Sequence, residues 1–239
     1  MRPLRRTAAA LASAALASAG LSACGSASPT VAQVQGASPI SKSLLDHWIE
    51  IESILAYDTI PKAPIPAGVI AVPPHYSACI AFLATRPYLR EHGTPKATPA
   101  QLKARCVQHF VEVKRKALGY MIAFRWVAGE LARRGLTITQ AEVRKAIRMF
   151  QIKDFRSTRQ FENYMTYAHL TPPDLHFILE YTVMGNKLQK QGITRKALSP
   201  AEQSQELASF IRRWTAKTSC KPHYVVAGCK EYRGSETPL

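Results

Sequence analysis

The chain has 239 residues, 46% of them hydrophobic, so it can form one or two domains with a core and is not a disordered chain. Lys and Arg number 32 against 16 Asp and Glu, which gives a formal net charge of +16. Without the first 23 residues, which carry three arginines and no acid, the net charge is +13. In a cytosolic protein this charge would suggest nucleic acid. Outside the cell it suggests anionic lipid, cell-wall polymer or acidic polypeptide, or equally a solvated surface with no specific partner.

Residues 1–23 predict a secretory signal peptide. The opening MRPLRR is basic, and residues 7–22 are uncharged and mostly Ala and Leu. This run is too short and too weakly apolar for a transmembrane helix, which needs about 20 apolar residues. It ends in LSAC, which resembles the bacterial lipobox and implies that Cys24 carries lipid at the start of a tether over residues 24–30. The alternative is an ordinary signal cleaved nearby, with no role for Cys24.

The other four cysteines are an even number, as expected for a protein of an oxidising compartment. The sequence has no Cys-x-x-Cys and no histidine at zinc-ligand spacing from these thiols, so no metal site is expected. Four cysteines allow three pairings. We favour the pairing that joins neighbours in the sequence, Cys79 to Cys106 and Cys220 to Cys229.

Apolar and polar residues alternate around Gly36 over residues 31–40, which predicts a short strand and a turn. From Ser41 an apolar stripe at helical spacing predicts a helix to about Leu55. Five prolines predict a loop over residues 61–74.

The remainder of the chain is predicted to be helical, because sequences typical of capping boxes recur along it. The candidate boxes are Thr98/Gln101, Thr139/Glu142, Ser157/Gln160, Thr171/Asp174 and Ser199/Glu202. The helices that follow are predicted at residues 98–135, 140–154, 158–169, 172–190 and 200–217. No further strand-rich region is expected, so the predicted fold class is mainly α with a short β element at its front.

Four segments resemble SurA/PrsA-type foldases, which are extracytoplasmic chaperones that often carry a parvulin prolyl isomerase domain. The opening strand, turn and helix of the family resemble residues 31–48 of this chain, VAQVQGASPISKSLLDHW, in which Gln-Gly stands in place of the usual Asn-Gly turn. The middle helices are similar in TITQAEVRKAIRMF and in STRQFENYMTYAHLTPPDLHFIL. The closing helix and cysteine loop of actinobacterial-type members are similar to FIRRWTAKTSCKPHYVVAGC. Together the resemblance covers about residues 31–229.

The resemblance implies a SurA N-terminal-like helical chaperone domain over residues 31–196. Residues 197–239 would complete the same module, with a C-terminal helix that packs back on the N-terminal helices. In the family's enzymes the parvulin domain lies between the last two long helices. Here KLQKQGITRKALSPAEQ joins these helices directly and leaves no room for it. The sequence also lacks Gly-x-Ser-x-Gly, a phosphate-binding glycine loop and His-Glu-x-x-His, so neither isomerase nor other enzyme activity is expected, and no cofactor.

Met and aromatic residues are frequent in the central helices, and most of them are expected to form the core. Some are candidates for an open surface that binds unfolded polypeptides, because flexible Met and flat rings suit promiscuous contacts. The candidates are Trp126, Met149, Phe155, Phe161 and Phe177. Trp126 is the strongest, because Phe124 and Leu131 already define a buried face of its helix.

The sequence therefore predicts a membrane-anchored extracytoplasmic chaperone that binds unfolded exported proteins and does not bind nucleic acid. The alternative is a non-catalytic cell-envelope lipoprotein that binds one specific partner on the same scaffold.

Overall fold

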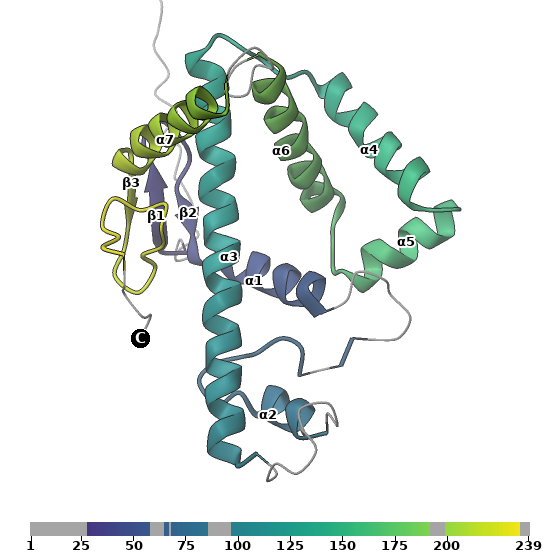
Figure 1. Cartoon of the computed structure of the whole chain (residues 1–239). Coiled ribbons are helices and arrows are strands. Elements are labelled where there is room, and N and C mark those ends of the chain that lie inside the picture. The colour runs from purple at the N-terminus through teal and green to yellow at the C-terminus, as the bar shows by residue number, and fades with distance from the viewer. Residues whose placement is uncertain (1–27, 58–64, 67, 86–96, 192–198, 235–239) are drawn as a thin grey trace, which may run out of the picture.

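The computed structural model describes residues 28–57, 65–66, 68–85, 97–191 and 199–234. The signal peptide and Cys24 lie outside these residues. Within the described ranges the chain forms seven helices and a three-stranded sheet, which confirms the mainly α fold. The long helix α3 is the central column (Figure 1). The sheet and α7 lie on one side of α3, and α4, α5 and α6 lie on the other.

The helices are α1 (Lys42–Tyr57), α2 (Ser77–Ala84), α3 (Pro99–Arg133), α4 (Gln140–Asp154), α5 (Thr158–Tyr167), α6 (Pro172–Gln191) and α7 (Pro200–Ala216). The strands are β1 (Thr30–Val34), β2 (Ile40–Ser41) and β3 (Thr218–Cys220). The helices predicted from the sequence are all present. The short helix α2 and strand β3 were not predicted.

The sheet joins the two ends of the described chain. Its order is β2-β1-β3, and β1 is antiparallel to both neighbours. Ala32 of β1 lies opposite Cys220 of β3, and Val34 lies opposite Thr218. The turn from β1 to β2 contains Gly36 with φ +82°, a backbone conformation that glycine adopts without a steric cost. The C-terminal segment thus completes the same module as the N-terminal strand.

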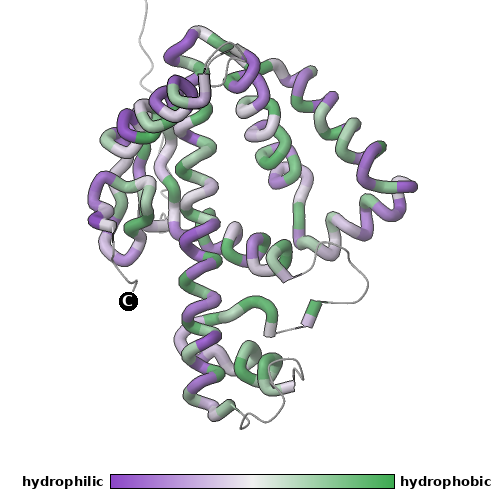
Figure 2. Tube along the Cα trace, viewed as in Figure 1, coloured by the Kyte–Doolittle hydropathy of each residue, from purple (hydrophilic) through white to green (hydrophobic). Residues whose placement is uncertain are grey.

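Helix α3 has 35 residues and is about 50 Å long at 1.5 Å per residue. Hydrophobic and hydrophilic residues alternate along its whole length (Figure 2), because its apolar residues recur every three or four positions. Val113, Ala117 and Met121 are buried where α1, α6 and the sheet pack against α3. The amphipathic pattern of the sequence therefore located the central element of the core.

Capping boxes begin four of the five helices for which the sequence predicted them. In each, the Ser or Thr hydroxyl accepts an N–H three residues on, and the side chain at that position accepts the N–H of the cap. The confirmed boxes are Thr98/Gln101, Thr139/Glu142, Thr171/Asp174 and Ser199/Glu202. The exception is α5, where Ser157 accepts from Gln160, but the Gln160 side chain accepts the N–H of Arg156 instead.

The disulfide between Cys79 and Cys106 ties α2 to the first half of α3, with 6.1 Å between the two Cα atoms. Both cysteines are buried and pack with Ala71 and Tyr76 in a small separate core. The described part of the predicted proline-rich loop, which leads into α2, contains no helix or strand. The disulfide therefore reinforces a region whose own core contains only four buried residues among those described.

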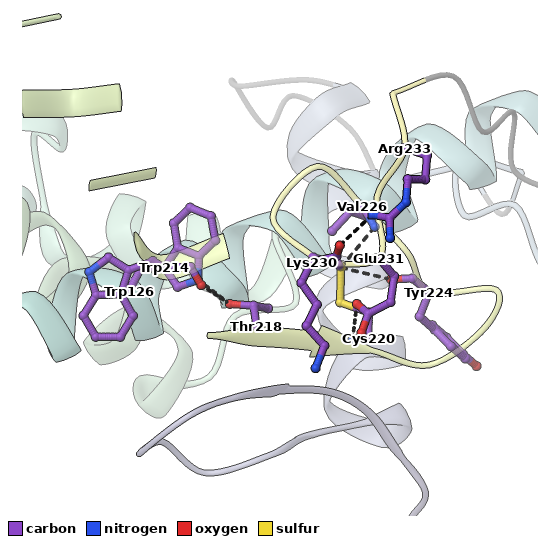
Figure 3. Close-up of a disulfide and its surroundings, with 10 residues drawn as sticks. Trp126, Trp214, Thr218, Cys220, Tyr224, Val226, Lys230, Glu231 and Arg233 are labelled. Carbon is purple, nitrogen blue, oxygen red and sulfur yellow. Dashed lines mark hydrogen bonds between the residues drawn. A yellow bond between two sulfur atoms is a disulfide. The ribbon is translucent and has the colours of Figure 1, made fainter. Parts of the chain in front are cut away.

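The second disulfide, between Cys220 and Cys229, closes the C-terminal loop directly after β3 (Figure 3). The Glu231 carboxylate accepts the N–H of Cys220 at 3.0 Å, and the N–H of Lys230 donates to the carbonyl of Thr218 at 2.9 Å. Both disulfides have the pairing that the sequence favoured. They fit an oxidising extracytoplasmic environment.

Glu130 of α3 is a fully buried carboxylate that binds α7. It accepts hydrogen bonds from Arg133 and Arg134 of its own helix, and from Arg213 and the Trp214 indole of α7. Burial opposes ionisation of Glu130, but these hydrogen bonds outweigh it and lower the pKa to about 2. The Trp214 ring lies against Gly129, where a Cβ atom would come within 2.1 Å of Trp214 Cη2. The helix contact therefore needs both the carboxylate and the glycine.

We predict that Glu130→Gln lowers the free energy of unfolding by about 3 kcal/mol at pH 7, because it leaves buried donors and cations without their anion. Urea unfolding followed by circular dichroism measures this change. Glu162→Gln, at an exposed position of α5, is the control and should leave the free energy within about 0.5 kcal/mol of the wild type.

The pH dependence checks the same interaction. The stabilisation by ionised Glu130 is fully present above the ordinary pKa of 4.5 and is lost as the pH falls towards 2. The difference in the free energy of unfolding between the wild type and Glu130→Gln should therefore become smaller as the pH falls over this range. A difference that stays constant with pH would contradict the role assigned to the carboxylate.

Candidate client-binding surface

Trp126 is not part of an open surface, contrary to the sequence prediction. Its side chain is 8% exposed, and its indole N–H donates to the Thr218 hydroxyl at 2.8 Å. The ring also makes an edge contact with Phe210 of α7. The prediction was wrong because α3 is covered on two sides. The C-terminal helix and strand bury the side of α3 that faces away from α6.

Phe177 of α6 closes the core between three helices. Its ring stacks on Phe124 of α3, with 4.1 Å between the ring centroids and 22° between the planes. Trp48 of α1 lies 5.0 Å from the same ring, and Tyr120 lies 5.7 Å from it. Phe177 is half-buried by these contacts. It holds α6 against the column, and its ring contacts belong to the main core.

Phe155 and Phe161 lie together where α4 meets α5, with ring centroids 5.4 Å apart. Phe150 lies 5.3 Å from Phe155, and Tyr164 lies 5.2 Å from Phe155. We call these four side chains the aromatic cluster. Each of them is half-buried, so part of every ring faces solvent.

The aromatic cluster is open because few buried residues lie beneath it. The described residues of α5 include no buried side chain, and those of α4 include only Val143. Met149 and Ile152 of α4 are 38% and 71% exposed, so the same helix also presents apolar side chains to solvent. They are three residues apart and share one side of the helix. The sequence analysis identified Met149 but missed Ile152, although both fall outside the buried stripe of α4.

Exposed positive charges surround this apolar surface. Residues 140–167 contain six basic and three acidic residues, and all six basic side chains are exposed. The six are Arg144, Lys145, Arg148, Lys153, Arg156 and Arg159. Figure 2 shows hydrophilic residues interspersed with hydrophobic ones along α4. A polypeptide segment that carries both apolar and acidic side chains would match the apolar surface and the positive charges around it.

Two histidine–carboxylate pairs attach the turn between α5 and α6 to α1. His47 Nε2 lies 2.8 Å from Asp174 Oδ1, and His169 Nδ1 lies 2.6 Å from Glu50 Oε1. Burial opposes ionisation of Asp174, but hydrogen bonds from Thr171 and His47 outweigh it and lower the pKa of Asp174. Asp46, next to His47 in the sequence, pairs with Lys42 instead. Asp46 and His47 thus bind different partners and do not form an acid–base pair with each other.

One group of potential metal ligands occurs within the described ranges, namely Cys220, Cys229 and Glu231. Its two sulfur atoms are joined to each other, and Glu231 binds a backbone N–H. None of the described helices is both long and apolar enough to cross a lipid bilayer.

Comparisons of the chain with protein-family models, with curated proteins and with solved structures find no match. The resemblance to SurA/PrsA-type foldases therefore rests on sequence motifs alone.

We predict that Asp174→Ala lowers the free energy of unfolding by about 2 kcal/mol, because it removes a helix cap and the partner of His47 together. Chemical unfolding at pH 7 measures the loss. Asp46→Ala is the matched control, because it removes an exposed pair on α1 and should cost less than about 1 kcal/mol. Equal effects of the two substitutions would argue against a role for Asp174 in holding the turn.

Proposed function

We propose that this protein is an extracytoplasmic chaperone, anchored to a membrane through lipid on Cys24, that holds unfolded exported polypeptides on the aromatic cluster. The observation that carries the proposal is the cluster of four half-buried aromatic side chains at the junction of α4 and α5, together with exposed Met149 and Ile152 on α4. An exposed apolar surface with a polar rim is typical of a site that binds another protein, a ligand or a membrane.

Unfolded polypeptides present apolar side chains, and burying these side chains against the rings removes apolar area from water. Each square ångström so buried is worth about 25 cal/mol. Aromatic rings and a flexible Met side chain accept many partners, which suits a binder of diverse sequences. The surrounding basic side chains raise the rate of encounter with acidic segments. Contacts of this strength are reversible, so release needs no nucleotide.

The proposal excludes prolyl isomerase activity. Helix α6 ends at Gln191 and α7 begins at Pro200, so the connection between them has no space for a parvulin domain. Binding alone is therefore the activity that we assign.

A membrane anchor is compatible with the place where the described chain begins. The Ser28 hydroxyl accepts the N–H of Ser43, and the Pro29 carbonyl accepts the N–H of Lys42. Ser28 and Pro29 are thus fixed to the first turn of α1, four and five residues after Cys24 in the sequence, and a lipid on Cys24 would hold the helical body close to the bilayer. Net positive charge favours the same location, because many bilayer surfaces are anionic.

We predict that the combined substitution Met149→Glu and Ile152→Glu abolishes suppression of aggregation, because it replaces the exposed apolar side chains of α4 with two negative charges at positions that do not support the core. The assay is light scattering of several unrelated unfolded proteins with the purified chain added. Leu207→Glu with Ile211→Glu is the matched control, since these α7 residues are 49% and 43% exposed and lie far along the chain from the cluster.

The control pair should keep full activity. Failure of the wild type to protect any test protein would contradict the chaperone proposal and favour the alternative of one specific partner. Loss of protection in both pairs would show that general surface apolarity acts, and not the aromatic cluster.

We predict that Cys24→Ser moves the protein from the membrane fraction to the soluble extracytoplasmic fraction, because the serine hydroxyl cannot take the place of the lipidated thiol. Stable anchoring requires more than one acyl chain, which a lipoprotein cysteine supplies. Fractionation measures the change of location, and mass spectrometry of the mature N-terminus measures the loss of lipid. Retention of the serine variant in the membrane would overturn the lipid anchor.

A further inference from the structure

A cleft of about 520 Å³ lies between α1, the loop over residues 70–73, α3 and the C-terminal disulfide loop. Its lining is largely apolar, with Leu45 and Ile49 from α1, Ile70 from the loop and Phe110 from α3. Val72, on the same loop, is 62% exposed at the edge of the cleft. The volume is in the range of ligand-binding sites, about 300–1,000 Å³.

Two lysines and one carboxylate meet at one end of this cleft. Lys42 pairs with Asp46. Lys114 Nζ donates to the carbonyl of His223 at 2.9 Å and lies 5.0 Å from the centre of the Tyr224 ring. Neither partner of Lys114 is an anion. Burial and the charge of Lys42 both lower the pKa of Lys114, which is the direction expected for an ammonium group without an anionic partner.

The rim formed by α1 offers acceptors for a backbone. Asp46 and Glu50 are four residues apart and therefore lie on the same side of the helix. Asp46 uses Oδ2 for Lys42, and Glu50 uses Oε1 for His169. Within the described part of the chain the second oxygen of each carboxylate makes no hydrogen bond, so it is available to accept an N–H from a bound chain. A fatty acid has no such donor, whereas an extended polypeptide has one at every residue except proline.

We propose that this cleft binds the C-terminal end of an extended polypeptide, with the terminal carboxylate on Lys114 and the last apolar side chain against Leu45, Ile49 and Phe110. The proposal rests on the proposed function in one respect, because it takes an unfolded polypeptide as the partner. It shares no residue with the aromatic cluster, so the two sites can be tested separately.

The test uses the full mature chain and a fluorescently labelled hexapeptide of Ala and Val that ends in Leu. Fluorescence anisotropy compares the peptide as free acid and as C-terminal amide. The free acid should bind about tenfold more tightly, as expected for one charge-assisted hydrogen bond. Lys114→Gln should remove this preference and leave binding of the amide unchanged. Lys103→Gln, at an exposed position of the same helix, should keep the preference.

Val72→Glu provides a second variant that does not depend on Lys114. It places a negative charge at an exposed edge of the cleft, so the fold is retained and binding of the free acid should fall several-fold. Equal binding of acid and amide by the wild type would overturn the proposal. Displacement of the peptide by laurate at lower concentration than by unlabelled peptide would also overturn it, because the occupant would then be a lipid.

The aromatic cluster variant Met149→Glu with Ile152→Glu separates failure of the two proposals. If this variant loses aggregation suppression but keeps the preference for the free acid, both proposals are supported. If the wild type suppresses aggregation but shows no such preference, the cleft proposal alone fails. If it shows the preference but suppresses no aggregation, the chaperone proposal alone fails.

Discussion

The buried ion cluster around Glu130 determines how the two ends of this chain come together. One carboxylate satisfies three arginines and an indole, and two of these four donors belong to α7. A buried charge without partners is strongly unfavourable, so α7 has a single favourable position on α3. That position places β3 beside β1 and buries Trp126 beneath the C-terminal segment. The sheet, the second disulfide loop and one wall of the cleft all follow from it.

The sequence predicted those elements of the fold that local interactions determine. Apolar spacing and capping residues act within one or two helical turns, so they located α3 to α7 and their first residues. The structure adds elements that depend on distant partners. Strand β3 has three residues and no alternating pattern of its own, and it forms because β1 offers an edge. Helix α2 is short and is held to α3 through Cys79.

The residues of the candidate surface also differ in how far the sequence could place them. Phe155 and Phe161 were candidates only as aromatic residues of the central helices, and the structure places their rings together where α4 meets α5. Trp126 could not be placed correctly, because nothing near it in the sequence shows that α7 returns to cover it. The cleft was not anticipated either. Its residues come from four separate segments, and Lys114 is distinguished from other lysines only by the His223 carbonyl and the Tyr224 ring beside it.

The antiparallel pairing of β1 with β3 has a consequence for biogenesis. A chain that emerges with its N-terminus first presents the β1 edge and the Trp126 side of α3 long before Cys220 is available. The sheet can close only after β3 has left the ribosome or crossed a membrane. Until then the nascent protein exposes apolar surface, as do the unfolded polypeptides that we propose as its substrates, so this part of its own fold forms late.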